Sequence, residues 1–359
     1  MIGWADVWGV VVAIAPLYKA LMLGYSSVKW WHMFTPEHCE AINRLVCYFT
    51  YPLFVFEFAA HVDPFKMNYM LIAADVISKV IVVAVLCCWA KFSSKGGCSW
   101  FITSFSLSTL TNSLVVGVPL LKAMYGPMAV DLVVQCSVFQ ALVWLTVLLF
   151  VLEVRRTCTN QHIFHDNENG ANGDLENGGQ ISSDKTSHMS SSRRPSFSSL
   201  MKDVWLKLAM NPNSYACILG IIWAFLSNRW HFRMPIIMDG SILIMSRAGT
   251  GTAMFSMGLF MALQEKVVPC GASLALLGMA LKFIAGPLAM ALGSLAVGLH
   301  GDVLRVAIIQ AALPQSITSF IFAKEYGLHA DVLSTAVIFG MIVSLPVLIG
   351  YYAILEFVH

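Results

Sequence analysis

The sequence predicts an all-α integral membrane protein with ten transmembrane helices. Apolar residues fill 58% of its 359 positions and charged residues only 12%, whereas soluble domains carry roughly 25% charged residues. The apolar residues gather into runs of about 20, the length that a helix needs to cross a bilayer. The net charge of +2 gives no reason to expect a nucleic-acid partner. No nucleotide-binding, metal-binding or thiol-redox motif occurs in the sequence, so we expect no enzyme activity, no cofactor and no metal.

Ten apolar runs define the predicted spans. The first run is expected to remain in the protein rather than to be cleaved as a signal peptide, because it is too long and no basic region precedes it. The runs are, in order, 7–28, 41–60, 70–91, 100–122, 130–153, 213–229, 241–263, 271–298, 303–323 and 332–356.

Residues 154–203 differ in composition from the rest of the chain. They are rich in Asn, Gly and Ser and have almost no aliphatic periodicity, so they cannot bury enough apolar area to offset their chain entropy. We expect a short disordered loop that separates a first five-helix half, residues 1–153, from a second half, residues 204–359. Basic residues lie more often at the span ends on the side of this loop, which predicts that the loop is cytosolic.

The two halves contain an internal repeat at an offset of 203 positions. Lys79 in the third run matches Lys282 in the eighth, and residues 110–113 (Leu-Thr-Asn-Ser) match residues 313–316 (Leu-Pro-Gln-Ser). Because each half holds an odd number of spans, the two halves run in opposite directions through the membrane. This inverted-repeat plan is typical of secondary transporters, which bind their substrates near the bilayer midplane at interrupted helices.

The fourth and ninth runs carry the signals of an interruption. Pro314 removes a backbone donor and opens the ninth helix, and Thr111 and Asn112 place polar groups at the middle of the fourth. The amides of Asn112 and Gln315, beside the positive ends of half-helices, would suit a carboxylate. The alternative is that both amides only hydrogen-bond between helices and that Pro314 only kinks one of them. Their equivalent positions in the repeat favour a binding site.

A second polar group lies in the third run. Asp75 and Lys79 are four positions apart, so they share one helix face and can pair. An ion pair inside the hydrocarbon region is costly and often functional, although a purely structural pair that joins helices is an equal alternative. Gln140, in the middle of the fifth run, could join them.

Eight strings of the sequence, spread over nearly the whole chain except residues 154–203, match a known family. They are residues 43–46 (NRLV), 61–68 (HVDPFKMN), 112–119 (NSLVVGVP), 211–213 (NPN), 253–262 (AMFSMGLFMA), 309–315 (IQAALPQ), 322–326 (FAKEY) and 333–340 (LSTAVIFG). Through these strings the chain resembles the PIN-FORMED auxin efflux carriers of plants. It departs from that family at two positions. Thr111 stands where members usually have proline, and Tyr51 stands where they usually have a smaller aliphatic residue.

The resemblance implies the ten-helix fold that bile-acid symporters and sodium/proton antiporters share. In that fold, helices 1, 2, 6 and 7 form a scaffold domain that makes a homodimer, and helices 3–5 and 8–10 form a transport domain that slides in an elevator motion. Helices 4 and 9 would be broken and would cross at Thr111 and Pro314, beside a support site of Asp75, Lys79 and Gln140. Together with Gln315 from the repeat, the expected substrate-binding residues are Asn112, Tyr51, Asn213, Ile317, Gln315 and Val115.

The resemblance also implies a function, which is export of the indole-3-acetate anion, or a related aromatic carboxylate, out of the cytosol. A central segment of about 50 residues matches the short-loop branch of the family. Members of that branch are mostly found at the endoplasmic reticulum, so we expect a protein embedded in the lipid of that membrane, with the plasma membrane as the alternative. Amides rather than carboxylates stand at the crossing, which argues against coupling to Na⁺ or H⁺. The membrane potential alone could drive the anion. An H⁺- or Na⁺-coupled carrier of another organic anion, with Asp75 as the proton site, and a receptor that does not transport are the alternatives.

Overall fold

The computed structural model describes residues 4–92, 97–156, 212–264 and 270–357, together with residues 202, 205, 206, 210 and 268. Within these residues the chain is helical between short connections, and its only extended pairing is one isolated bridge. The predicted all-α class is confirmed. Apart from residues 154–156 and 202, the predicted central loop lies outside the described residues.

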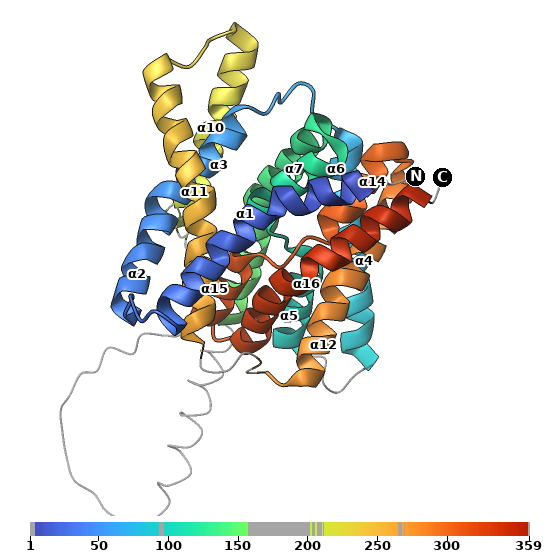
Figure 1. Ribbon diagram of the computed structural model, residues 1–359. Helices are drawn as coiled ribbons and strands as arrows, with labels where there is room; N and C mark the ends of the chain where they lie inside the picture. The colour runs from blue at the N-terminus through green and yellow to red at the C-terminus, as the bar shows by residue number, and fades with distance from the viewer. Residues whose placement is uncertain are drawn as a thin grey trace, which may run out of the picture.

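The helices of Figure 1 follow the predicted runs closely. They are α1 (Trp4–Lys29), α2 (Pro36–Leu45), η1 (Val46–Thr50), α3 (Tyr51–Ala60), α4 (Tyr69–Phe92), α5 (Cys98–Thr109), η2 (Ser113–Gly117), α6 (Val118–Tyr125), α7 (Pro127–Phe139), η3 (Gln140–Trp144), α10 (Pro212–Trp230), α11 (Ile236–Leu263), α12 (Ala272–Ala280), η4 (Leu281–Ala285), α13 (Gly286–Val297), α14 (Gly301–Ala311), α15 (Ile317–Glu325) and α16 (Ala330–Phe357). The η elements are single π-helical turns that continue into neighbouring helices.

Each of the ten predicted runs is helical, and two of them are interrupted. The fourth run is α5 followed by η2 and α6, with residues 110–112 between them, and the ninth is α14 followed by α15, with residues 312–316 between them. Among the described residues, five helices are long and apolar enough on their own to cross a membrane. These are Trp8–Lys29, Tyr69–Phe92, Pro127–Arg156, Ala272–Val297 and Ala330–Phe357. The ten-span topology therefore stays a prediction, with which the helical segments agree.

The helices pack into two groups, each with members from both halves of the chain. In the first group α11 contacts α1, α2 and α3, and α10 contacts α3; Figure 1 shows α2, α3, α10 and α11 together on one side of the molecule. In the second group α4 packs on α5, α7 and α13, while α16 packs on α12, α14 and α15. The first group corresponds to predicted helices 1, 2, 6 and 7, and the second to helices 3–5 and 8–10. A division into domains that move separately stays a prediction.

Within the first group, α1 and α11 approach so closely that glycine is required at their contact. A Cβ atom on Gly24 would lie 2.1 Å from the carbonyl oxygen of Phe255, and one on Gly258 would lie 2.0 Å from that of Leu21. Small residues at such contacts allow helix backbones to approach in a membrane, where no hydrophobic effect drives apolar helices together. These two glycines therefore set the spacing of α1 and α11.

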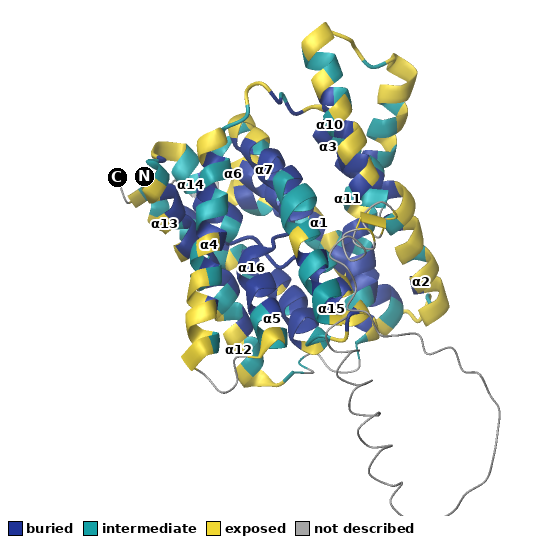
Figure 2. Ribbon diagram, turned by 180° about the vertical axis from the view of Figure 1, so that it is seen from behind, coloured by how far each residue is buried: buried dark blue, intermediate teal, exposed yellow. Residues whose placement is uncertain are grey.

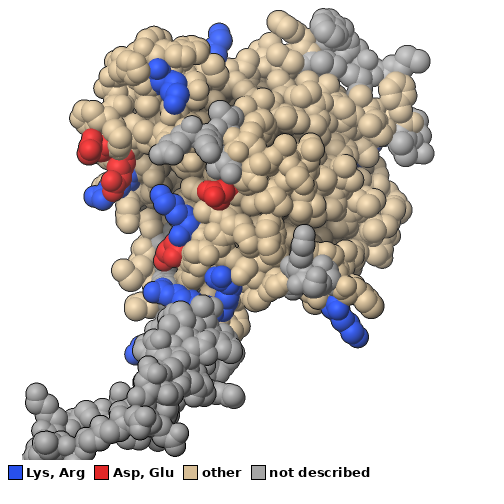
Figure 3. All heavy atoms as spheres, turned by 90° about the horizontal axis from the view of Figure 1, so that it is seen from below, with Lys and Arg blue, Asp and Glu red and all other residues tan. Residues whose placement is uncertain are grey.

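The outer sides of the helices carry large apolar side chains. Figure 2 shows buried residues where the helices meet and exposed residues along their outward sides and ends. Figure 3 shows that charged side chains on one end of the molecule are few and stand on an otherwise uncharged surface. A large exposed apolar surface is unusual for a soluble monomer. Its most exposed members in the middle of long helices are Val80, Val85, Ile244, Leu276, Ile284 and Leu288.

Candidate functional site

The two interrupted helices meet at their breaks. Thr111 and Gln315 form an isolated antiparallel bridge. The backbone N–H of Asn112 donates to the carbonyl oxygen of Pro314 at 2.9 Å, and the N–H of Ser316 donates to that of Leu110 at 3.4 Å. The interruptions that the sequence predicted at Thr111 and Pro314 are therefore present and face each other. Pro314 explains the break in the ninth run, because it has no N–H and restricts the residue before it.

The fourth run breaks without proline because Gln140 binds the open backbone of Thr111. The Gln140 Oε1 atom accepts a hydrogen bond from the Thr111 N–H at 3.1 Å and another from its hydroxyl at 3.2 Å. The Gln140 Nε2 atom donates to the Thr111 carbonyl oxygen at 2.9 Å. One amide thus satisfies both backbone groups that the helix no longer pairs, which buried backbone requires.

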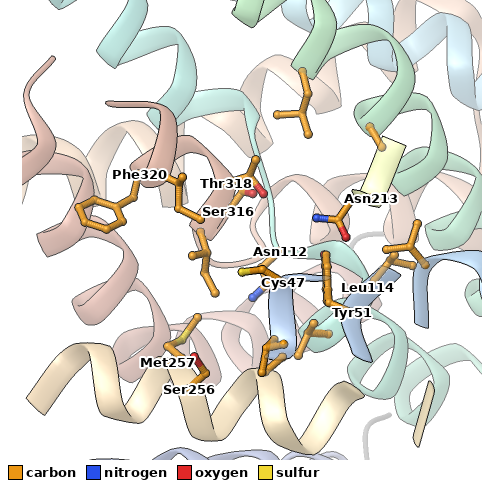
Figure 4. A pocket seen from close by; sticks show the side chains of 18 of the residues that line it. Cys47, Tyr51, Asn112, Leu114, Asn213, Ser256, Met257, Ser316, Thr318 and Phe320 are labelled. Atoms are coloured by element: carbon orange, nitrogen blue, oxygen red, sulfur yellow. The ribbon is translucent and has the colours of Figure 1, made fainter. Parts of the chain in front are cut away.

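A cavity of about 280 Å³ lies against this crossing, between the two groups of helices. Figure 4 shows Asn112 inside it, with Tyr51 and Asn213 on one side and Ser316 and Phe320 on the other. The amide nitrogen of Asn112 is buried and has no hydrogen-bond partner among the described residues. Five of the six predicted substrate-binding residues line this cavity. They are Asn112, Tyr51, Asn213, Ile317 and Val115.

Gln315, the sixth residue, does not line the cavity. Its side chain is wholly buried, and its Nε2 atom donates to the carbonyl oxygen of Ser106 at 3.0 Å and to the hydroxyl of Ser319 at 2.6 Å. The sequence placed this amide correctly at the crossing but could not give the direction in which it points. In this geometry Gln315 joins α5 to α15, and a direct contact with a ligand stays a prediction that the geometry does not support.

None of the described residues that line the cavity is basic. Of the described residues that line it, Glu40 alone carries a charge, and Glu40 pairs with Arg44 at 2.5 Å. Two helical segments begin at the cavity wall, Ser113–Tyr125 and α15. Helix N-termini present free N–H groups and a partial positive charge, both of which favour an anion.

The cavity extends from the crossing toward one end of the molecule. Its outer lining comes from Cys39 and Glu40 near the start of α2, Leu259 near the end of α11 and Phe322 in α15. The fifth predicted span ends at Arg156, where the predicted loop begins.

The predicted support site is partly assembled. Asp75 and Lys79 form the expected ion pair, and both side chains are largely buried. The indole N–H of Trp144 donates to the second oxygen of Asp75 at 2.8 Å, and the Lys79 ammonium lies 4.9 Å from the centre of the Trp144 ring. Asp75, Lys79 and Gln140 all line a second, smaller cavity of about 30 Å³. The hydrogen bonds of Gln140, however, go to Thr111 rather than to the ion pair.

Three further residues hold this region and were not predicted as site residues. Trp144 binds the ion pair. Gln310 donates to the hydroxyl of Ser113 at 2.7 Å. Lys282 is wholly buried and donates to the carbonyl oxygen of Leu110 at 3.0 Å. The repeat made Lys282 the equivalent of Lys79, and the position of Gln310 as an amide in an apolar run is a signal that could have found it. Nothing in the sequence pointed to Trp144.

Comparisons with known proteins place the chain in a family. Residues 9–352 match the family described as membrane transport protein. The chain is 68% identical, over all of both chains, to "Auxin efflux carrier component 5" of Arabidopsis thaliana, and 62% identical, again over all of both, to "Probable auxin efflux carrier component 5a" of Oryza sativa subsp. japonica. It is 39% identical to "Auxin efflux carrier component 8" of Arabidopsis thaliana, over 99% of this chain and all of that one.

These matches confirm the resemblance that the sequence strings predicted, and they cover the relatives along their full length. The matched proteins are membrane transporters and not enzymes, which agrees with the expectation of no enzyme activity. The chain belongs to the auxin efflux carrier family of membrane transport proteins.

Proposed function

We propose that the protein carries auxin, as the indole-3-acetate anion, out of the cytosol. The names of its relatives support this substrate. The observation that carries the proposal is the amide nitrogen of Asn112, which lies at the cavity wall without a hydrogen-bond partner among the described residues. A buried donor without a partner costs about 1–3 kcal/mol, so an acceptor such as a carboxylate oxygen is favoured there. A carboxylic acid with an ordinary pKa of about 4 to 5 is almost wholly ionised in the cytosol and cannot cross lipid unaided.

The cavity also fits the aromatic part of such a ligand. Its volume of about 280 Å³ lies near the lower end of the roughly 300–1,000 Å³ found for ligand pockets, which favours a small substrate. Tyr51, Val115 and Ile317 supply apolar wall around Asn112. In the proposed pose, the carboxylate meets Asn112 and the N-terminus at Ser113, while the indole ring lies against these apolar side chains.

The position of the cavity between the two helix groups suggests how it opens to both sides. Asn112 and Ile317 belong to the second group, which includes the crossing, whereas Tyr51 and Asn213 belong to the first. We propose that the second group slides along the first as an elevator and carries the crossing and its anion across the membrane. The first group would stay fixed as a scaffold, pair with a second copy of the chain, and face lipid with its exposed apolar side chains.

The proposed direction is from the cytosol into the lumen of the endoplasmic reticulum. In this proposal the cavity opens on the side of the predicted cytosolic loop and would load anion from the cytosol. Imaging of the tagged full chain in plant cells, beside markers of the endoplasmic reticulum and of the plasma membrane, tests this location.

Uptake into proteoliposomes tests the function itself. Purified protein is reconstituted with an imposed membrane potential, and radiolabelled indole-3-acetate is compared with tryptamine, which keeps the indole ring but carries an ammonium in place of the carboxylate. We expect saturable, potential-driven uptake of indole-3-acetate alone, unchanged without Na⁺ or a pH gradient. Uptake that requires either gradient would favour an ion-coupled carrier, and binding without uptake would favour a receptor.

A further inference from the structure

Lys282 is a buried lysine for which the proposed substrate contacts give no role. It lies in η4, its exposed fraction is 0%, and it is among the largest wholly buried side chains of the described residues. Its Nζ atom donates to the carbonyl oxygen of Leu110 at 3.0 Å. An ionisable group inside a membrane span is costly and is retained where it acts, and π-helical turns often mark functional positions.

The partner of Lys282 is an open helix end. Leu110 follows the last residue of α5, so its carbonyl has no partner within that helix, and no water is available in the hydrocarbon region to replace one. Gly286, four residues after Lys282, lies against the same helix end. A Cβ atom there would lie 2.4 Å from the carbonyl oxygen of Ser108 and 3.6 Å from that of Ala311, in the last turn of α14. The carboxyl ends of both interrupted helices therefore converge on the turn that carries Lys282.

The repeat shows that Lys282 differs from its counterpart. Lys79 pairs with Asp75, which lies four residues before it. The position four residues before Lys282 is Gly278, which has no side chain to pair with the amino group. Lys282 binds the backbone at the break instead, so the two equivalent lysines have separate roles.

The contact with Lys282 is one of four that hold the segment before the free amide of Asn112. Lys282 and, at a longer distance, the Ser316 N–H donate to the carbonyl of Leu110, Gln140 binds both backbone groups of Thr111, and the carbonyl of Pro314 accepts the N–H of Asn112. We propose that Lys282 is a positioning residue for anion binding, whose amino group makes the shorter of the two hydrogen bonds to the carbonyl at the open end of α5 and so holds Asn112 at the cavity wall. This inference rests on the proposed function. It implies that no separate, exchangeable cation has to bind at the break, because the Lys282 amino group already occupies the Leu110 carbonyl.

Chemical rescue tests the proposal. Lys282→Ala removes the atoms of one n-propylamine molecule, so full-length Lys282→Ala and wild type are assayed for indole-3-acetate binding and uptake with and without n-propylamine. We expect Kd and KM to rise by about tenfold or more with kcat little changed, as expected for loss of a hydrogen bond that aids binding. n-Propylamine should restore affinity, whereas tetramethylammonium, a cation without an N–H donor, should not. Ser294→Ala is the control, because Ser294 is also wholly buried but its hydroxyl has no hydrogen-bond partner among the described residues.

Lys282→Met keeps most of the volume of the side chain and removes only the donor, so it serves if the alanine variant does not fold. Wild-type affinity in either variant overturns the inference while leaving the proposed function intact. A fall in kcat and in Tm that accompanies the rise in KM would show a merely structural role and would also overturn the inference. If wild type itself does not bind indole-3-acetate, the proposed function fails, which is a separate result.

Discussion

At the scale of single residues, the crossing depends on amides that replace backbone partners. Thr111 has no proline beside it, yet its helix opens because Gln140 binds its N–H and its carbonyl. Gln315 binds the carbonyl of Ser106 in the same way. With these groups paired, the amide nitrogen of Asn112 remains without a partner among the described residues. These side chains thus pair with the opened backbone, while the Asn112 donor at the cavity wall stays unpaired among the described residues.

Asn112→Ala tests that donor. We expect the affinity for indole-3-acetate to fall by about 10- to 150-fold, because a hydrogen bond to a charged group is worth roughly 1.5–3 kcal/mol. The thermal stability of the unliganded protein should hardly change, since the amide nitrogen has no partner to lose. Asn228→Ala is the matched control, because that amide binds the carbonyl of Ala224 at 2.8 Å and does not line the cavity. Equal affinity of Asn112→Ala and wild type would remove Asn112 from the binding site.

Asp75 and Lys79 are expected to act as a unit. Removing either one leaves a buried charge without its partner, which typically costs about 3–5 kcal/mol, so Asp75→Asn and Lys79→Met should each lower Tm and transport. The double variant should lose less than the sum of the two, with a coupling above about 0.5 kcal/mol. Thermal unfolding and uptake of all four proteins measure this cycle, and simple additivity would mean that the two residues act independently.

At the scale of elements, the ends of helices determine where charge is favoured. The segments that begin at Ser113 and Ile317 present their amino ends to the cavity, which favours an anion. The opposite ends, where α5 and α14 stop, face Lys282 and Gly286. An interrupted helix therefore has an amino end that favours an anion and a carboxyl end that favours a donor, and the two lie on different sides of one crossing.

The connection between α15 and α16 gives a pH prediction at the same scale. His329 stacks on Trp100 with ring centres 3.8 Å apart and shares a 3.0 Å hydrogen bond with the hydroxyl of Thr103. Burial, and secondarily the positive charge of Arg155, lower the pKa of His329 below its ordinary value of 6.5. The unfolded chain therefore takes up a proton before the folded protein does, so this histidine costs no stability above about pH 6.5 and lowers stability as the pH falls below that value.

Thermal unfolding in detergent at several pH values between about 5 and 7.5 measures this effect. We expect Tm to fall toward acid pH in wild type and to fall less steeply in His329→Gln. His300→Gln, at an exposed position, serves as the control and should follow wild type. An unchanged pH dependence in His329→Gln would show that the folded environment does not disfavour the charged imidazole.

At the scale of the whole molecule, apolar run length and polar interruptions were enough to predict the helices and their breaks. All ten runs are helical, and both breaks lie where Thr111 and Pro314 stand. The direction of Gln315 and the contact between Lys282 and Leu110 could not be predicted, because they depend on how the two halves pack against each other. The bond from Trp144 to Asp75 joins residues 69 positions apart, and no local pattern marks it.

The last prediction concerns the connection between the two halves. The composition of residues 157–200 predicts disorder, so replacing them with a Gly/Ser linker should leave uptake into liposomes nearly unchanged. Loop-closure entropy varies only with the logarithm of length, so the change should cost well under ~1 kcal/mol. Arg155 must be kept, because it donates to the hydroxyl of Ser99 at 3.1 Å and to the carbonyl of Tyr326 at 3.2 Å. A shortened protein that inserts with normal orientation but carries no substrate would show that these residues take part in transport, and the plan of two halves joined by a passive connection would be wrong.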